Sequence, residues 1–415
     1  MYRVAGNEFV APGGKQFIPY GFVIYCLAMK SLRCEHPTRH DPNTDIDRIR
    51  AAASFWHADA VRIQVAPEHL FHRGVVESSY VSVLDGEIQL ANKLGMVAIV
   101  TDQTEEFKGP PLPTSSAVRF WRYMAAHYAG NRRVFFDLYN EPRLKPTSGE
   151  HWMWNLWRNG GTATVKGVTD HFVGMQRLVD VIRHAGAANV IIAEGNQGDH
   201  DLSLVRHYLL SGTNIAYGIE PDLTANDQTP VEWAKNWGDL SDELPIAMEA
   251  FQDWPSASVC NPRSPRLLPQ LLDYLREKRL GLIVWSLEGG QMIVGTNLRK
   301  PTTFRGTSSY RCGNTGLTIG GRAHDRGYSG ARAGQRPERN RIKEPPVIAS
   351  ADVGPGQDVL GFFRTMHSHG VVPQSPTSAG GPVPWSIAGS LGAIAVLFVG
   401  GVVLRRRRRS VHGAP

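Results

Sequence analysis

Cysteine is scarce in this chain, and its spacing excludes two kinds of protein. The 415 residues include only four cysteines, Cys26, Cys34, Cys260 and Cys312. They are too few for a disulfide scaffold, and their spacings do not fit a zinc site. Cys26 can pair with Cys34, and Cys260 with Cys312, if the protein is extracellular; buried free thiols are the alternative.

Excess positive charge is missing from most of the chain. The net charge is +7, but residues 405–409 are five arginines, and residues 311–344 hold eight basic side chains against three acidic ones. Without these two segments the net charge is about −3. A nearly neutral body does not indicate a nucleic acid as partner.

A glycine-rich phosphate-binding turn is also missing. Short apolar runs occupy residues 17–24, 60–65, 96–100, 134–138, 190–193, 215–219, 245–248 and 282–285. Helix-like stretches follow them at residues 45–55, 81–94, 116–128, 169–184, 202–210, 230–237, 265–278 and 358–366. Eight strands, each followed by a helix, predict an α/β fold of the (β/α)8 TIM barrel type. A doubly wound open sheet is the alternative, but residues 21–26 (GFVIYC) do not supply its glycine-rich turn.

Three segments interrupt the alternation within and after a catalytic domain predicted at residues 1–369. The loop at residues 144–167 carries Trp152, Trp154 and Trp157, which suit either sugar platforms or a packed lid. Residues 306–347 are predicted to be an irregular basic insertion. Residues 370–382 read as a linker rich in proline, serine and glycine.

An apolar run long enough to span a membrane lies near the C-terminus. Residues 385–404 carry no charge, and five arginines follow them. We expect a single transmembrane helix at residues 383–404 and a basic cytoplasmic tail at residues 405–415, with the barrel outside the cell. A core helix is the alternative. No export signal is visible, because residues 1–10 are polar and resemble a strand and turn.

The predicted strand ends carry the candidate chemistry, because barrels of this kind form their active sites there. Residues 134–143 read VFFDLYNEPR and place Asn140 and Glu141 after the fourth strand, while Glu249 ends the seventh. Two glutamates on nearly opposite strands can act as acid/base and nucleophile in retaining glycoside hydrolysis. Plainer roles are open for both: Glu141 can begin a helix with Pro142 at its first position, and Glu249 can cap the helix after it.

Three further strand-end residues suit a sugar-binding site. Arg62 on the second strand can keep Glu249 ionised through its charge, or can be an ordinary salt-bridge partner. Asn140 is placed to hydrogen-bond a sugar hydroxyl, and Trp285 on the eighth strand offers a flat apolar face, unless it only packs. The sequence implies neither a metal nor an organic cofactor, since two carboxylates and water suffice for this chemistry.

These motifs together resemble glycoside hydrolase family 5 of clan A, the family of many endoglucanases and mannanases. The resemblance covers about residues 9–369, and its strongest part is HYAGNRRVFFDLYNEPR at residues 127–143. It implies that Glu141 is the acid/base and Asn140 its substrate-binding neighbour. It also implies that Glu249, within LPIAMEAF, is the nucleophile. Arg62 and Trp285 match the family's strand-2 arginine and strand-8 tryptophan.

Two strand ends depart from the family pattern. Where the family usually has a histidine after the third strand, this chain has Asp102 and Gln103, and Glu220 and Asp222 replace a His-x-Tyr pair after the sixth. An acid near Glu249 would raise the pKa of one carboxyl by like-charge repulsion. The predicted substrate-binding residues are Arg62, Gln103, Asn140, Glu220, Asp222 and Trp285.

The sequence thus predicts a retaining β-glycosidase without cofactors, held at the outer surface of a cell membrane. Its expected partner is a β-linked oligo- or polysaccharide of the glucan (cellulose) or mannan type. The alternative is a catalytically altered or inactive barrel that serves as a surface glycan-binding protein. The changed third and sixth strand ends motivate that alternative.

Overall fold

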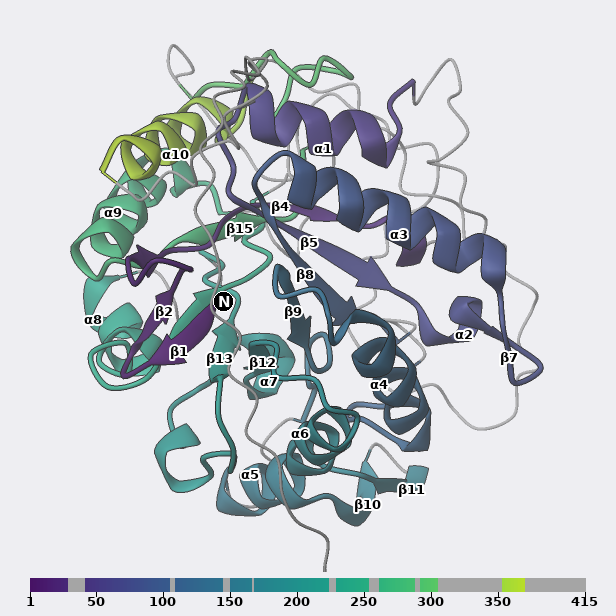
Figure 1. Cartoon of the computed structure of the whole chain (residues 1–415). Helices are drawn as coiled ribbons and strands as arrows, with labels where there is room; N and C mark the ends of the chain where they lie inside the picture. The colour runs from purple at the N-terminus through teal and green to yellow at the C-terminus, as the bar shows by residue number, and fades with distance from the viewer. Residues whose placement is uncertain are drawn as a thin grey trace, which may run out of the picture. The chain divides into compact units, whose positions relative to one another are not determined.

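Eight parallel strands form the centre of the computed structural model (Figure 1). They are β4 (Tyr20–Ile24), β5 (Ala60–Val65), β8 (Val97–Asp102), β9 (Val134–Asp137), β12 (Ile191–Glu194), β13 (Ile215–Ile219), β14 (Ile246–Met248) and β15 (Leu282–Val284). From β4 to β14 each strand pairs with the next in chain order, and β15 pairs with β4. A parallel bridge between Phe251 and Val284 joins β14 to β15, so the sheet closes and the predicted (β/α)8 barrel is confirmed.

The structure describes residues 1–28, 42–104, 109–144, 150–165, 168–223, 229–253, 261–287, 292–304 and 353–369. The predicted insertion, linker, transmembrane helix and cytoplasmic tail (306–347, 370–382, 383–404 and 405–415) all lie outside these residues. Within the described part of the chain, no helix is both long and apolar enough to cross a membrane.

One predicted cysteine alternative is settled. Cys26 is buried and disulfide-bonded, so it is not a free thiol. Cys34, Cys260 and Cys312 lie outside the described residues, and the pairings predicted for them stay predictions.

The barrel strands are apolar because both of their faces are covered. In β5, which reads AVRIQV, all six residues are buried. Side chains on alternate positions point into the barrel, where one apolar cluster includes Ala60, Ile99, Phe135 and Ile192. The other positions pack against the surrounding helices in a second, larger cluster.

The helices that surround the barrel are α1 (Asp45–Ser54), α2 (Pro67–Leu70), α3 (Ser78–Lys93), α4 (Ser115–Tyr128), α5 (Glu150–Asn159), α6 (Met175–His184), α7 (Asn196–Asp199), α8 (Pro230–Trp233), α9 (Ser264–Glu277) and α10 (Gly356–His369). The predicted helices at residues 45–55, 81–94, 116–128, 265–278 and 358–366 are confirmed to within a few residues. A capping box stabilises the start of helix α1: the side chains of Thr44 and Asp47 each accept a hydrogen bond from the other residue's backbone N–H.

Three other predicted segments were wrong in part. The stretch 169–184 is helical only from Met175, because β11 (Val168–Phe172) pairs with β10 (Gly161–Val165) in an antiparallel hairpin. The stretch 202–210 contains only the short helix η3 (Val205–His207). The stretch 230–237 consists of α8 and a turn of π-helix, η4 (Ala234–Gly238).

A small antiparallel sheet closes the N-terminal end of the barrel. It consists of β1 (Arg3–Ala5), β2 (Glu8–Val10) and β3 (Gln16–Phe17). Tyr2, Phe9 and Phe17 pack against Phe135 inside the barrel, with ring centroids 5.7–6.2 Å apart. The N-terminal end is therefore filled, and the polar side chains lie at the C-terminal end. The remaining hairpin, β6 (Phe71–His72) with β7 (Val75–Val76), leads from α2 to α3.

Candidate active site

The alternation of the strands determines which side chains enter the site. On β9, Phe135 belongs to the apolar layer inside the barrel, and Asp137 stands two residues further along. On β12, Ile192 and Glu194 are related in the same way. Because residues i and i+2 share a face, both carboxylates point inward above the apolar layer.

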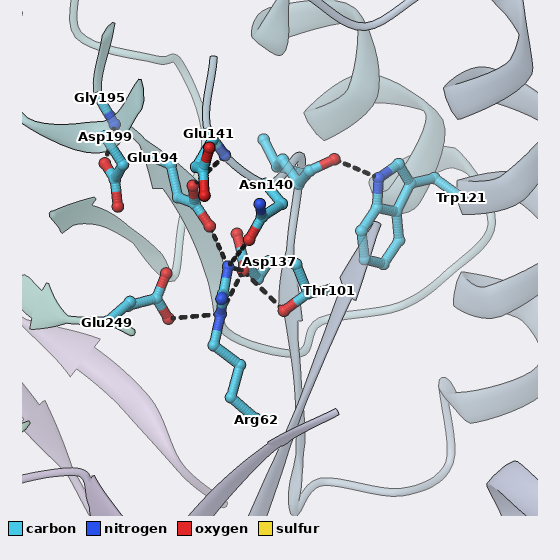
Figure 2. A network of polar contacts seen from close by, with 11 residues as sticks. Arg62, Thr101, Trp121, Asp137, Asn140, Glu141, Glu194, Gly195, Asp199 and Glu249 are labelled. Carbon is cyan, nitrogen blue, oxygen red and sulfur yellow. Dashed lines mark hydrogen bonds and ion pairs between the residues drawn. The ribbon is translucent and has the colours of Figure 1, made fainter. Parts of the chain in front are cut away.

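Arg62 is the centre of the resulting network (Figure 2). Its Nε and Nη2 donate to Asp137 Oδ2 at 2.9 and 2.6 Å, and Nη2 also donates to Asn140 Oδ1 at 3.0 Å. It also forms a hydrogen-bonded ion pair with Glu194, and its Nε lies 3.8 Å from Glu249 Oε1. Arg62 and these three carboxylates are completely buried, so one guanidinium faces three acids away from water.

Asp137 and Glu194 were not predicted as site residues. The sequence did contain a signal, because each acid lies two positions beyond an apolar residue that faces the barrel interior. Asp137 also accepts a hydrogen bond of 2.7 Å from the Thr101 hydroxyl. Both acids therefore have a defined place, in which they form ion pairs with Arg62.

Glu249 lies where the prediction placed it, just beyond β14, but its electrostatics differ from the expectation. Among the residues that the structure describes, none donates a hydrogen bond to its carboxylate oxygens, and the Arg62 ion pair is long. Burial and the negative charge of Asp137 raise the pKa of Glu249 to about 8, although Arg62 acts in the opposite direction. Arg62 thus favours the ionised form of Glu249, as the sequence predicted, but burial and Asp137 together have the larger effect on this pKa. Desolvation outweighs the single guanidinium, which three carboxylates share.

Glu141 stands beside this network at the end of β9 and is more accessible than Glu249. Its backbone N–H donates to Glu194 Oε2 at 2.6 Å. Its side chain is 19% exposed and lies 3.7 Å from Arg143 Nη1. The φ angle of Glu141 is 48°, a backbone conformation that non-glycine residues seldom adopt. Glu194 thus connects the positions of Glu141 and Arg62.

Glu220 and Asp222 follow β13 and are nearly inaccessible. Burial raises the pKa of both carboxyls, and the charge of Glu141 raises each of them further. The like-charge repulsion expected here therefore involves Glu141. For Glu249 the repelling neighbour is instead Asp137.

The third strand end contributes Asp102 and Gln103, both buried. The Gln103 backbone N–H donates to Val65 O at 2.9 Å, which continues the pairing of β5 with β8. Asp102 accepts from the Thr104 hydroxyl at 2.8 Å. Burial raises the pKa of Asp102. The described contacts do not join Gln103 to Arg62, so a role for Gln103 in binding substrate stays a prediction.

The tryptophans divide between rim and core. Trp285, at the end of β15, is half-buried, and its ring lies 5.8 Å from that of Tyr25 with an angle of 31° between the planes. In α5, Trp154 and Trp157 are fully buried, and Trp157 Nε1 donates to Glu194 O at 2.9 Å. Only Trp152 is markedly exposed, at 42%. Two of the three tryptophans in the 144–167 segment therefore pack the fold.

Among the described residues, two groups place three possible metal-ligand atoms within 4.8 Å of one another. The first comprises Asp137, Glu194 and Glu249. Arg62 contacts all of its members, so a protein cation already neutralises it in part. The second comprises His200, Glu220 and Asp222.

Comparisons with solved structures agree with the barrel fold. A beta-glucanase from Saccharophagus degradans matches with 18% identity, 73% of this chain and 89% of that chain covered, and a TM-score of 0.57. The same enzyme in complex with cellotetraose matches with 19% identity, the same coverage and the same TM-score. A hyperthermophilic endocellulase from Pyrococcus horikoshii matches with 15% identity, 72% and 95% coverage, and a TM-score of 0.55. At these identities the likeness establishes the fold.

A family model identifies the family of the chain, which the structural likeness alone does not. The model described as cellulase (glycosyl hydrolase family 5) matches residues 37–290, more than half of the chain. These residues include every barrel strand from β5 to β15. The chain therefore belongs to glycosyl hydrolase family 5 and is a glycoside hydrolase.

Proposed function

We propose that the protein is a retaining β-glycosidase that hydrolyses β-linked glucan, with Glu141 as the acid/base and Glu249 as the nucleophile. Glu141 protonates the leaving oxygen while Glu249 attacks the anomeric carbon and forms a glycosyl–enzyme intermediate. Glu141 then removes a proton from water, which releases the sugar and restores both carboxyls. No cofactor takes part in these steps.

The observation that carries the proposal is the shared contact of the two strand ends with Arg62. The guanidinium lies 3.8 Å from Glu249 and 3.0 Å from Asn140, the residue before Glu141. One buried side chain thus relates the positions of both proposed catalytic groups. Such preorganisation is what a double displacement requires, because both carboxyls must stay aligned with one glycosidic bond.

The two glutamates also have unlike surroundings, although the raised pKa of Glu249 is opposite to what a nucleophile requires. Glu141 is partly exposed beside Arg143, whereas Glu249 is buried among acids. Acid/base pairs are made by environments that separate the protonation behaviour of two similar groups. The raised pKa of Glu249 means that the nucleophile becomes fully ionised only above about pH 8.

The substrate class rests on the related structures. A beta-glucanase of the same fold has been solved with cellotetraose, so we propose a β-linked glucan here and keep a mannan as the alternative. Arg62, Asn140 and Trp285 are the proposed sugar-binding residues nearest the catalytic pair. Gln103, Glu220 and Asp222 are proposed to lie further along the bound chain.

We also propose that residues 383–404 anchor the enzyme in the cell membrane with the barrel outside. The uncharged run and the arginines after it support this orientation. The disulfide at Cys26 is in keeping with an oxidising compartment.

Alanine variants test the catalytic assignment. Hydrolysis of a soluble β-glucan and of a chromogenic β-cellobioside should fall by several orders of magnitude in Glu249→Ala and in Glu141→Ala. Glu243→Ala, which removes an exposed acid paired with Arg206, is the matched control and should stay fully active. Hydrolysis that survives both active-site changes would refute the assignment, and glucan binding by a wild type without turnover would favour the glycan-binding alternative.

A further inference from the structure

His200, Glu220 and Asp222 form a cluster that takes no part in the two proposed chemical steps. His200 follows α7, and the two acids follow β13, so two separate segments of the chain contribute the three side chains. Their ligand atoms lie within 4.8 Å of one another. Glu220 and Asp222 are buried, and His200 is half-buried. Imidazole and carboxylate groups in this combination are common ligands of divalent transition metals.

Backbone hydrogen bonds hold each of these three residues in place. His200 Nδ1 lies 3.1 Å from the carbonyl oxygen of Glu220, which acts as acceptor, so Nε2 keeps its lone pair. The Glu220 backbone N–H donates to Asp199 O at 2.8 Å. Asp222 Oδ1 accepts from the Gln252 backbone N–H at 2.7 Å, which leaves Oδ2 available. Outer contacts of this kind orient metal ligands in proteins.

The Glu220 carboxylate provides an independent reason to expect a cation. Its residue is only 2% exposed, yet no hydrogen bond or ion pair to this carboxylate occurs among the described residues. A buried carboxylate without a partner is unfavourable unless a positive charge compensates it. The negative charges of Glu141, Asp222 and Asp199 act on this carboxylate more strongly than the positive charge of Arg62.

The spacing suits an ion that lies between the three side chains. Metal–ligand bonds of about 2.0–2.2 Å place two donors of one ion at most about 4.4 Å apart. The observed limit of 4.8 Å therefore requires only small side-chain rotations. The other candidate group, Asp137, Glu194 and Glu249, differs because Arg62 already occupies its centre.

We infer that His200, Glu220 and Asp222 form a binding site for a divalent transition-metal ion, with Zn²⁺ as the best match to one imidazole and two carboxylates. Three protein ligands leave a coordination position open to water or to a sugar hydroxyl. Histidine as a ligand favours Zn²⁺ over Mg²⁺ and Ca²⁺, which prefer oxygen donors. This inference is independent of the proposed reaction, because ion binding can be measured without turnover.

Calorimetric titration of the chelator-treated full-length chain with Zn²⁺ tests the site. One equivalent should bind the wild type. His200→Ala and Glu220→Gln should each weaken binding by at least about 10-fold, the loss typical even of outer contacts of a metal site. His171→Ala, on the exposed β10–β11 hairpin, is the matched histidine control and should bind like the wild type. Ca²⁺ should bind more weakly than Zn²⁺.

Two further measurements keep the test decisive. Zn²⁺ should raise the melting temperature of the wild type but not that of the His200→Ala or Glu220→Gln protein, provided that circular dichroism shows both variants folded. Glu249→Gln should bind Zn²⁺ as the wild type does. Binding that Glu249→Gln abolishes and His200→Ala leaves unchanged would assign the ion to the other acidic group and overturn the inference. An absence of saturable Zn²⁺ binding by the wild type would overturn it as well.

Discussion

The backbone N–H of Glu141 donates a hydrogen bond of 2.6 Å to the carboxylate of Glu194, which also accepts from Arg62. This bond joins the end of β9 to the end of β12. It accompanies a φ of 48° at Glu141, a conformation that requires support from its surroundings. Glu194 is thus a positioning residue for the proposed acid/base, although it does not itself have to touch the substrate.

Removal of Glu194 should therefore lower turnover more than substrate binding. Glu194→Ala is expected to reduce kcat by roughly 100-fold, the scale of effect produced by misplacing a catalytic group by about 1 Å. Glu194→Gln keeps an acceptor for the Glu141 N–H and should restore part of the loss. Steady-state kinetics that separate kcat from KM provide the measurement. Equal kcat per folded molecule in both variants and the wild type would argue for a purely structural role.

Gly218 on β13 leaves room for the catalytic acids. A methyl group at this position would lie 2.8 Å from Glu249 Oε2 and 3.1 Å from Glu194 Cγ. Gly218→Ala should therefore displace Glu249 and lower kcat/KM on the order of 10- to 100-fold. Gly86→Ala is the control, since an added methyl group there meets no atom within 4 Å. It should leave kinetics unchanged and stabilise α3 by about 0.5–1 kcal/mol.

Loss of Arg62 should destabilise the fold strongly. Arg62→Met leaves three buried carboxylates without their cation, and breaking a buried ion pair in this way costs about 3–5 kcal/mol. Arg206→Met removes an ion pair with Glu243 whose side chains are 43% and 60% exposed, so it should cost at most about 1 kcal/mol. Urea unfolding of both variants makes the comparison. Similar midpoints for the two would contradict the role assigned to Arg62.

The pH dependence of activity should reflect Glu249. Its pKa is raised to about 8, and only the ionised carboxylate can attack the anomeric carbon. We therefore expect kcat/KM for an activated aryl β-cellobioside, whose leaving group departs without a proton from Glu141, to increase as the pH rises through about 8. A profile that is already level from pH 6 to 8 would show that the nucleophile is ionised at neutral pH and that Arg62 prevails over burial.

The same carboxyl, that of Glu249, should make the folded protein less stable as the pH rises. The folded protein holds a proton on Glu249 up to about pH 8, whereas the ordinary pKa of a glutamate is 4.5. Between these two pH values the folded state binds more protons than the unfolded state. The contribution of Glu249 to stability is therefore complete below pH 4.5 and declines as the pH rises to about 8. The slope is up to about 1.4 kcal/mol per pH unit for one proton. Unfolding curves of Glu249→Gln should lack this decline.

The sequence was sufficient for the barrel and for its two prominent glutamates. Each barrel strand is an apolar run with a turn or a charge after it, because both faces of a parallel strand are covered. Glu141 and Glu249 were recognisable because a charged side chain directly after a buried strand must either be solvated or belong to a functional site. The prediction for residues 202–210 was wrong because the apolar residues of this stretch fit the spacing of a helix, whereas the structure has only the short helix η3 there.

Asp137 and Glu194 were harder to predict because they lie within or at the end of runs that are otherwise apolar. Alternation indicates that both face inward, but it does not show which residues meet across the barrel. Only closure of the eight strands brings them to Arg62, 75 and 132 positions away in the chain. Likewise the sequence places Glu220 and Asp222 after β13, while the approach of His200 depends on the fold of the α7 segment.

The identity of the residue that forms a covalent bond with the sugar tests the central claim most directly. The wild type can be incubated with an activated 2-deoxy-2-fluoro β-cellobioside, which slows release of the glycosyl–enzyme intermediate, and then digested and mapped by mass spectrometry. We predict one added disaccharide unit, located on the peptide that contains Glu249 and absent from Glu249→Gln. A label on Glu194 or another acid, or hydrolysis with inverted anomeric configuration and no label, would contradict the account.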